Sequence, residues 1–379
     1  MEPTTRAVHA GRHDLTRLGV HAPPIDLSST YPLHDVAAAE EAFAAFGRGE
    51  VCEDEPIYAR LHNPTVARFE HALAELEGTE AAVAFASGMA ALTACLLAVR
   101  ADAGHVVALR PLYGGSDHLL CSELLGLEVT WARPDTVAAA IRPDTGLVVL
   151  ETPQNPTLGL VDIAAVVEAA HGVPVLVDNT FATPILQNPA AHGAQLVLHS
   201  ATKYLGGHGD VVAGAVAASE DWARRLRRVR IATGGILHPL AGYLLHRSLP
   251  TLPFRVREAQ RRAGELVDRL AAHPAVVEVL YPHGELIGRQ QRGPGSIVSF
   301  ELEGGRDAAE AVMRSVRLIT PAVSLGSTDT LIQHPAGLTH SVLDPETRRE
   351  SGITPGLLRL SVGLEEVDVL WDDLVQALA

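Results

Sequence analysis

The most constraining feature of the sequence is a series of short apolar segments that alternate with helical segments from about residue 65 to residue 200. The segments "AAVAFAS", "HVVALR", "LEVTWA", "GLVVLE", "VPVLVDN" and "AQLVLHS" each have the length of one buried strand. Strands that are apolar on both faces are typical of a parallel sheet covered by helices on both sides. The alternation therefore predicts an α/β fold with a central, mostly parallel sheet.

The segments on either side of this series have a different character. The first 55 residues combine the Pro-rich segment "HAPPIDLSSTYPL" with the short helical segment "DVAAAEEAFAAF", which together predict an irregular arm. After about residue 240, a long amphipathic helical segment precedes the strand-like segments "PGSIVSFEL" and "LLRLSVGLE". We therefore expect an N-terminal arm at 1–55, a ligand-binding domain at 56–240 and a smaller α+β domain at 241–379.

The charge balance limits the possible partners. The chain has 30 basic and 45 acidic residues, a net charge of −15, whereas nucleic-acid binding requires a basic surface. We expect the one basic cluster, "RRLRRVR" at 224–230, to form the solvated face of a helix. The sequence contains no apolar run of 18 residues and no N-terminal signal-peptide pattern, so we expect neither a membrane span nor secretion.

The cysteine and histidine residues do not indicate a metal centre. The three cysteines are Cys52, Cys95 and Cys121, and their spacing fits neither a disulfide framework nor a zinc site. The 18 histidines include no HExxH motif and no cysteine-histidine pair with ligand spacing. We therefore expect no bound metal, and unpaired cysteines are typical of a reducing cytoplasm.

One lysine has unusual neighbours, in the segment "SATKYLGGHGDVVAG". Lys203 follows an apolar segment and is flanked by Ser200, Thr202 and several glycines. A lysine just past a strand usually extends to solvent. A desolvated lysine has instead a lowered pKa, and its amine can attack a carbonyl carbon. The two hydroxyl groups could hold a phosphate, and the glycines would let the backbone approach a ligand closely.

Two strand ends add groups that suit the same kind of ligand. Asp178 ends the apolar segment in "VLVDNTF", where it could cap a turn or pair with the ring nitrogen of pyridoxal 5′-phosphate, PLP. In "FASGMAAL", a strand passes through Ser87, Gly88 and Met89 into a helix. The free amide groups and the dipole of a helix N-terminus favour an anion at such a turn.

Three more residues could contact a ligand, although each also has a structural interpretation. Tyr113 in "RPLYGGS" could be a half-buried core residue or an aromatic face for a cofactor ring. Asn155 lies between two prolines in "ETPQNP", where it could form a turn or bind a ring oxygen. Arg359 lies in an apolar strand segment, and a buried arginine needs a partner such as a substrate carboxylate.

In this order, the motifs resemble the Cys/Met metabolism family of PLP-dependent enzymes, and most closely its methionine γ-lyases and cystathionine γ-lyases. The resemblance rests on "YARLHNPT", "SGMAAL", "PLYGG", "ETPQNPT", "DNTF", "SATKYLGGHGD" and "QHPAGLTHS", and it extends from "VHAG" to "LRLSVGLE". It implies the aspartate aminotransferase-like fold (fold type I), with PLP bound by residues 56–240. It also implies a homo-oligomer, a tetramer built as a dimer of dimers, in which the arm contacts a neighbouring subunit.

The resemblance implies a role for each matching residue. Lys203 would form the Schiff base with PLP, Asp178 would hold the pyridine nitrogen, and Tyr113 would stack on the ring and assist the leaving group. The other implied cofactor-binding residues are Ser87, Gly88, Met89, Asn155, Ser200 and Thr202, together with Tyr58 and Arg60 from a neighbouring subunit. The implied substrate-binding residues are Asn155, Val323, Ser324 and Arg359.

The implied reaction is the α,γ-elimination of a methionine-like sulfur amino acid to 2-oxobutyrate, ammonia and a thiol. Val323 stands where cystathionine-handling relatives tend to carry Glu, which favours methionine. Gly115 stands where methionine γ-lyases usually carry Cys, and Arg230 and Ile231 replace their usual Lys-Asp pair. A cystathionine γ-lyase, a γ-replacement synthase (cystathionine γ-synthase or O-acylhomoserine sulfhydrylase) and a non-catalytic PLP-fold scaffold are therefore alternatives.

Overall fold

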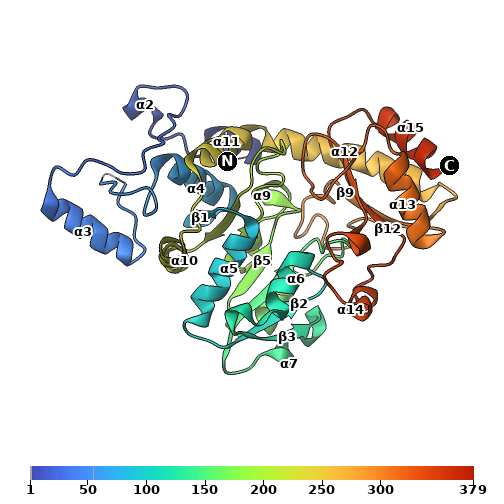
Figure 1. The fold of residues 1–379 in the computed structure, drawn as a ribbon, viewed down its shortest axis with the longest axis horizontal. Coiled ribbons are helices and arrows are strands. Elements are labelled where there is room, and N and C mark those ends of the chain that lie inside the picture. The colour runs from blue at the N-terminus through green and yellow to red at the C-terminus, as the bar shows by residue number, and fades with distance from the viewer. Residues whose placement is uncertain (1, 54) are drawn as a thin grey trace.

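The structure, a computed structural model, describes residues 2–53 and 55–379 and contains a large and a small β-sheet (Figure 1). The described residues form a seven-stranded large sheet with the order β1-β7-β6-β5-β4-β2-β3. Its strands are β1 (Ala81–Phe85), β2 (His105–Leu109), β3 (Glu128–Ala132), β4 (Thr145–Glu151), β5 (Val175–Asp178), β6 (Leu196–His199) and β7 (Gly214–Ala218).

The large sheet is mostly parallel, as predicted from the apolar segments. Only β7, among the described strands of this sheet, runs antiparallel to both of its neighbours. Helix α5 (Gly88–Arg100) and helix α10 (Glu220–Thr233) pack on one face, and α4 (Pro64–Glu77) and α8 (Ile163–Ala169) pack on the other. The apolar segments are therefore buried on both faces, which explains why they lack an alternating pattern.

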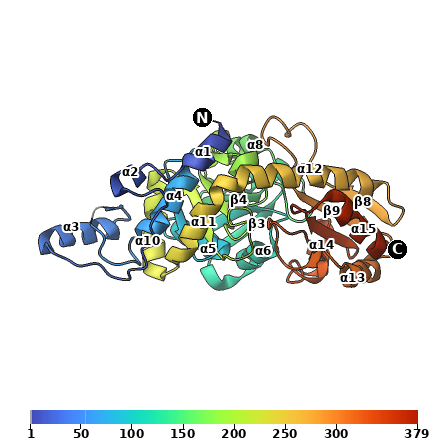
Figure 2. The same cartoon turned by 90° about the horizontal axis from the view of Figure 1, so that it is seen from above.

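The small sheet lies on the C-terminal side of the molecule (Figures 1 and 2). Its strands, in the order β10-β11-β12-β9-β8, are β8 (Val276–Leu280), β9 (Ile297–Leu302), β10 (Thr320–Pro321), β11 (Leu331–Gln333) and β12 (Leu357–Ser361). Its apolar core also includes residues of α12 (Leu252–Ala271), α13 (Gly305–Ser315) and α15 (Val367–Leu378). Helix α12 contacts both this sheet and the N-terminal helix α1 (Pro3–His9). The predicted domain boundaries stay a prediction.

Shorter elements connect these layers. The remaining α-helices are α2 (Leu15–Leu18), α3 (Val36–Gly47), α6 (Gly114–Cys121), α7 (Val137–Ala140), α9 (Thr183–Leu186), α11 (Pro239–Ser248) and α14 (Pro345–Glu350). Short 3-10 helices lie at Glu123–Leu125, Pro134–Thr136, Pro189–His192, Leu249–Thr251 and Pro335–Gly337. No helix within residues 2–53 and 55–379 is both long and apolar enough to cross a membrane.

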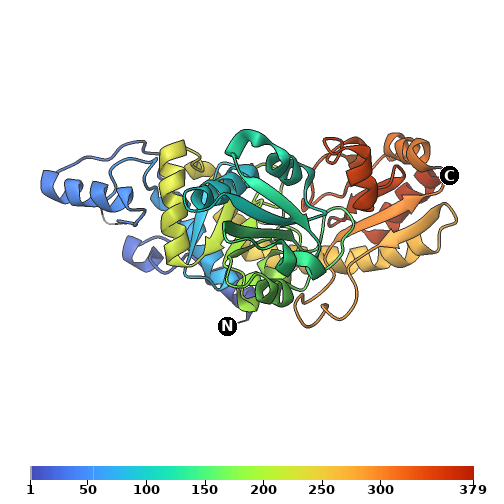
Figure 3. The same cartoon turned by 90° about the horizontal axis from the view of Figure 1, so that it is seen from below.

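The N-terminal arm is more ordered than its sequence suggested. Helix α3 was predicted, and the Asp35 side chain caps it by accepting hydrogen bonds from two backbone amides. It projects from the rest of the molecule as the blue helix at one end (Figure 3). Helix α1 was not predicted; Ala7 is buried where this helix packs against α4 and α12.

The basic cluster at 224–230 corrects one expectation. It lies on α10, but only part of it is solvated, because Arg227 and Arg230 are buried. Arg230 donates hydrogen bonds to Glu70 Oε1 at 2.5 Å and to the Ala84 carbonyl at 3.0 Å. Arg227 pairs with Glu220 of the same helix at 2.7 Å, and it donates a hydrogen bond to the Gly49 carbonyl at 3.2 Å. The cluster therefore also ties α10 to its neighbours, an arrangement that residue type alone does not reveal.

Candidate active site

A cavity of about 250 Å³ lies between the carboxyl ends of the large-sheet strands and the small sheet. Because β1, β4, β5 and β6 run in the same direction, their carboxyl ends meet at one edge of the sheet. Twelve of the fourteen predicted site residues line it: Ser87, Gly88, Met89, Tyr113, Asn155, Asp178, Ser200, Thr202, Lys203, Val323, Ser324 and Arg359.

Lys203 lies in the cavity rather than in bulk solvent. Its Nζ donates a hydrogen bond to Ser324 Oγ at 3.0 Å, which joins the two halves of the site. Burial, and then the positive charge of Arg359, lower the pKa of Lys203 to about 8. The amine is therefore available as a nucleophile or base under mildly alkaline conditions.

Glycines determine the path of the chain after this lysine. The amide of Gly207 donates to the Lys203 carbonyl at 2.7 Å, which closes a tight turn. Gly207 has a positive φ of 72°, and a Cβ atom there would lie 2.0 Å from Arg255 Nη1. The glycine run is thus needed for local packing as well as for access to the site.

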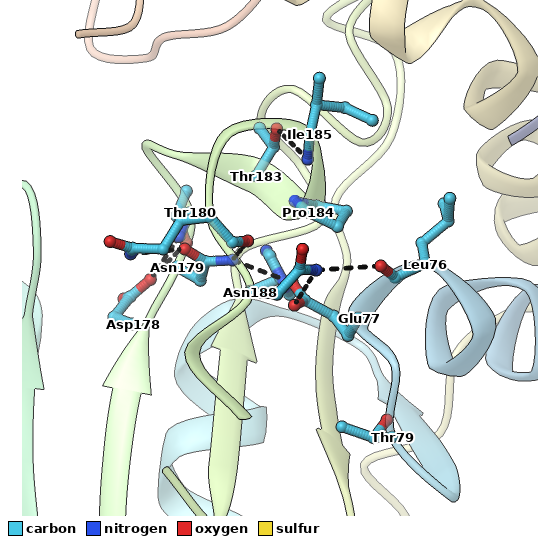
Figure 4. Close-up of polar contacts among 12 residues, drawn as sticks. Leu76, Glu77, Thr79, Asp178, Asn179, Thr180, Thr183, Pro184, Ile185 and Asn188 are labelled. Atoms are coloured by element: carbon cyan, nitrogen blue, oxygen red, sulfur yellow. Dashed lines mark hydrogen bonds and ion pairs between the residues drawn. The ribbon is translucent and has the colours of Figure 1, made fainter. Parts of the chain in front are cut away.

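Asp178 ends β5, and its carboxylate is fixed from one side. Thr180 donates to Asp178 Oδ1 from its backbone amide at 3.0 Å and from its hydroxyl at 2.5 Å (Figure 4). The hydroxyl of Thr180 also accepts a hydrogen bond from the Ser200 amide at 2.8 Å. Burial raises the pKa of Asp178 against the effect of these donors. Asp178 Oδ2 is therefore available to bind a ligand. A cationic ring nitrogen would best stabilise this buried carboxylate.

A buried polar network supports the turn that follows Asp178. Asn179 Nδ2 donates to Glu77 Oε1 at 2.9 Å, and Asn188 Nδ2 donates to Glu77 Oε2 at 3.3 Å (Figure 4). His199 Nε2 also contacts Glu77 Oε1 at 2.6 Å. Glu77, at the end of α4, therefore connects the turn to the neighbouring strand β6 and holds the aspartate in place.

The other end of the cavity suits an anion. Ser87 caps α5, whose first amide groups face this end, and Ser200 and Thr202 lie beside it. A Cβ atom on Gly88 would lie 3.0 Å from Ser200 Cβ, and one on Gly214 would lie 2.1 Å from the Ser87 carbonyl oxygen. Only glycines allow this close approach, and the resulting concave site fits a phosphate group.

Arg359 on β12 supplies a fixed positive charge. Its Nη1 donates to Asn155 Oδ1 at 2.9 Å, and its Nη2 donates to the Ser324 carbonyl at 2.9 Å. Only 3% of Arg359 is exposed, and burial lowers its pKa to about 10. A guanidinium group held in this way is suited to bind a carboxylate.

Tyr113 lies at the start of α6 and is 38% exposed at the cavity. Its backbone amide donates to Glu151 Oε2 at 2.8 Å. A Cβ atom on Gly115 would lie 2.6 Å from Cε1 of the Tyr113 ring. A residue other than glycine at position 115 would therefore force the ring to move.

Two predicted residues do not line this cavity. Tyr58 is 43% exposed, and Arg60 donates a hydrogen bond to the Ile231 carbonyl at 2.8 Å. Their predicted role was in the site of a neighbouring subunit, so it stays a prediction.

Sequence reasoning missed several lining residues. They are Ser116, Glu151, Thr180, Phe181, Leu198, Val212, Leu325 and Thr339. Glu151 ends a buried strand just as Asp178 does, and that shared pattern could have identified it. The others have common side chains in loops and show no pattern of their own. Among the described residues, no group of three or more His, Cys, Asp or Glu side chains could hold a metal ion.

Comparisons with known proteins indicate the same kind of cofactor site as the residues that line the cavity. The sequence model described as "Cys/Met metabolism PLP-dependent enzyme" matches residues 4–379. The chain is 61% identical to an L-methionine gamma-lyase of Streptomyces avermitilis, covering 99% of this chain and 88% of that protein. It is 56% identical to an L-methionine gamma-lyase of Brevibacterium sandarakinum, covering 100% and 98%.

Solved structures confirm the predicted fold class. The cystathionine gamma synthase from Xanthomonas oryzae pv. oryzae in complex with cystathionine matches with a TM-score of 0.91 at 38% identity. The cystathionine gamma-lyase from Lactobacillus plantarum complexed with L-serine matches with a TM-score of 0.90 at 34% identity. Each match covers 100% of this chain and 98% of the other.

Proposed function

The chain belongs to the Cys/Met metabolism PLP-dependent enzyme family, and we propose that it acts as an L-methionine γ-lyase. The reaction is the α,γ-elimination of L-methionine, which consumes one water molecule and gives 2-oxobutyrate, ammonia and methanethiol. One observation carries the proposal: a chain 61% identical to an L-methionine gamma-lyase places Lys203, Asp178 and Arg359 around one cavity.

The residues present fit the cofactor. PLP, when bound, withdraws electrons from the α-carbon of an amino acid. Asp178 Oδ2 would pair with the pyridine nitrogen, and Tyr113 would lie against the ring. The phosphate would bind at the start of α5, between the Gly88 turn and the hydroxyl groups of Ser200 and Thr202. Lys203 would carry the cofactor through Nζ.

Lys203 and Arg359 act on different groups of the substrate. Arg359 binds the α-carboxylate, and its guanidinium is oriented by Asn155 Oδ1 and by the Ser324 carbonyl. Lys203 Nζ removes the α-proton and holds it for return to the substrate, and Ser324 Oγ at 3.0 Å orients the amine. A substrate held by Arg359 would thus have its Cα–H bond within reach of the lysine amine.

The sulfur end of the substrate meets a different environment. The Tyr113 hydroxyl would give its proton to the departing sulfur, which leaves as a thiol. Val323 and Val212 line the cavity and are 53% and 67% exposed. Two apolar side chains suit an S-methyl group and offer no partner for the distal amino group of cystathionine.

Cystathionine is the second candidate substrate, favoured by Gly115. The Tyr113 ring occupies the space that a side chain at 115 would need, as the 2.6 Å distance from a Cβ atom shows. The same residues would serve γ-replacement if a thiol reached the cavity before water. The alternatives therefore differ in substrate and in acceptor rather than in catalytic residues.

A product assay tests the proposal. L-Methionine and L-cystathionine are supplied separately to the PLP-loaded protein, and 2-oxobutyrate and the released thiol are measured. Methanethiol and 2-oxobutyrate from methionine, with cystathionine a poor substrate, would support the proposal. Preference for cystathionine, or a new thioether formed from an acylated homoserine and a thiol, would contradict it. Lys203→Ala is the control that reveals background cleavage.

We propose further that the enzyme is a homotetramer, a dimer of dimers, in which Tyr58 and Arg60 complete the phosphate site of a neighbouring subunit. Support comes from the arm, where large apolar side chains are exposed: Leu27, Leu33, Val36 and Phe43 are 65%, 53%, 79% and 59% exposed. Co-expression of the Arg60→Ala and Lys203→Ala chains tests this sharing. A mixed dimer would contain one intact site and regain activity, whereas a mixture as inactive as its parents would contradict the sharing of sites between subunits.

The cytoplasmic location stays a prediction.

A further inference from the structure

Glu151 is a carboxyl group of the cavity to which the proposed reaction gives no role. It is the last residue of β4, it is only 4% exposed, and it lines the same cavity as Asp178 and Lys203. Its Oε2 accepts a hydrogen bond from the Tyr113 amide at 2.8 Å, and no described residue bonds to its Oε1. One carboxyl oxygen is therefore anchored, and the other is available to a bound molecule.

Glu151 and Asp178 form a pair of acids on neighbouring strands. They are directly paired in the register of the parallel strands β4 and β5, so their side chains leave the same face of the sheet. Two carboxylates in one enclosed site do not both ionise readily, because each opposes the charge of the other. The carboxylate with more hydrogen-bond donors keeps the charge.

The surroundings assign the charge to Asp178. Thr180 supplies two donors to Asp178, whereas Glu151 receives one backbone amide. Burial and the charge of Asp178 raise the pKa of Glu151 well above its usual range, although the Tyr113 amide and Arg359 act in the opposite direction. Lys203, Tyr113 and Arg359 also line this cavity, and burial lowers the pKa of Lys203 and of Arg359.

We propose that Glu151 is a positioning residue that works as a neutral acid. Its Oε2 holds the backbone of Tyr113 at the start of α6, and its proton, on Oε1, offers a hydrogen bond to the molecule in the cavity. The neutral state has a consequence for Arg359: an ionised Glu151 would compete with the substrate carboxylate for the guanidinium group. The inference rests on the proposed roles of PLP and Arg359.

The test compares Glu151→Gln with Glu151→Leu. Glutamine keeps the shape of the glutamate side chain. Its carbonyl oxygen accepts the hydrogen bond from the Tyr113 amide, and its NH₂ group donates a hydrogen bond, as a protonated carboxyl does. Leucine removes both functions. We expect the dissociation constant of PLP from apo-Glu151→Gln to stay within about threefold of wild type. Glu151→Leu should weaken PLP binding by about tenfold or more, because the Tyr113 amide loses its partner.

Substrate binding gives a second measure. The KM for L-methionine should stay near the wild-type value in Glu151→Gln, because Arg359 meets no new charge. The matched control is Glu128→Gln on β3, which removes an exposed carboxylate and should change neither constant. Thermal melting of each apoprotein shows whether the variant folds, and Glu151→Met replaces Glu151→Leu if that variant does not.

Two results would overturn the inference. Glu151→Gln as impaired as Glu151→Leu would mean that the site needs an anion at 151, and Glu151→Leu equal to wild type would mean that Glu151 has no role. An infrared difference spectrum of wild type against Glu151→Gln checks the charge directly: a carboxylic-acid carbonyl band should be present only in wild type. Because PLP binding is measured without amino acid, a wild type that binds PLP but does not cleave methionine contradicts the proposed function alone.

Discussion

The two sides of the cavity differ in chemistry. The large-sheet side carries two acids and an amine, Asp178, Glu151 and Lys203, at or just after the carboxyl ends of its strands. The small-sheet side carries a buried cation, Arg359, and the apolar Val323. The first set suits a cationic ring with an electrophilic carbonyl, and the second suits the carboxylate and thioether of an amino acid. Cofactor chemistry thus lies mainly on the large-sheet side, and substrate recognition lies mainly on the small-sheet side, with Val212 of the large-sheet side also facing the substrate.

Among the described residues that line the cavity, two hydrogen bonds join these sides. Lys203 Nζ donates to Ser324 Oγ at 3.0 Å, and Arg359 Nη1 donates to Asn155 Oδ1 at 2.9 Å. Variants on one side should therefore change mainly cofactor binding, and variants on the other should change mainly substrate binding. Four predictions test that division.

The largest effect is expected for Lys203→Ala. It removes both the attachment point of the cofactor and the base, and Lys203 is the only lysine in the 379 residues. We expect turnover of L-methionine to fall by at least about 10⁴-fold, because no other amine of the site can replace it. Measurable turnover at a tenth of the wild-type rate would contradict the assignment.

Asp178→Asn should have the next largest effect, on the cofactor side. An amide keeps the shape of the carboxylate but cannot balance a positive ring nitrogen, so kcat should fall by about 10²- to 10³-fold. The KM for methionine should change little, because Arg359 is untouched. Steady-state kinetics at saturating PLP separate the two constants, and a change confined to KM would contradict the division.

Arg359→Lys should have a smaller effect, on the substrate side. Lysine keeps the positive charge but loses the planar pair of donors, so kcat/KM for methionine should fall by about 10- to 100-fold. The dissociation constant of PLP should stay near wild type. Weakened PLP binding with an unchanged KM would reverse the assignment of the two sides.

The smallest effect is a pH dependence. The pKa of Lys203 is lowered from 10.5 to about 8, first by burial and then by Arg359, so the neutral, reactive amine increases as pH rises through 8. The rate at which the apoprotein takes up PLP should rise about fivefold from pH 7 to pH 8. In Arg359→Gln the profile should move to higher pH. If the rate of PLP uptake rose only near pH 10, Lys203 would have the pKa of a solvated lysine, which would contradict the prediction.

The sequence predicted much of the large sheet because its strands are apolar throughout. Strand β7 was not predicted, because "GAVAA" consists of small residues and follows a glycine-rich segment. The burial of Arg227 and Arg230 also escaped prediction, since a helical period does not show that Arg230 meets Glu70, or that Arg227 meets the Gly49 carbonyl, across the fold. Both depend on contacts between segments far apart in the chain.

The cofactor side of the site was more predictable than its supporting contacts. Lys203 and Asp178 stand out because polar groups interrupt apolar segments there. Glu77 gave no such pattern, because it is one of several acids in an amphipathic helix, and only the fold brings it against His199 and Asn179. The role of Glu151 likewise depends on its register with Asp178, which is a property of the sheet.

The proposed role of Lys203 is tested most directly by finding where the cofactor is attached. The PLP-loaded protein is reduced with borohydride and digested, and the pyridoxyl label is located by mass spectrometry. We expect one label per chain, on Lys203, and a smaller yield when L-methionine is added before reduction, because the substrate displaces the lysine. A label on the N-terminal amine, or a Lys203 peptide that stays unlabelled, would contradict the assignment of Lys203.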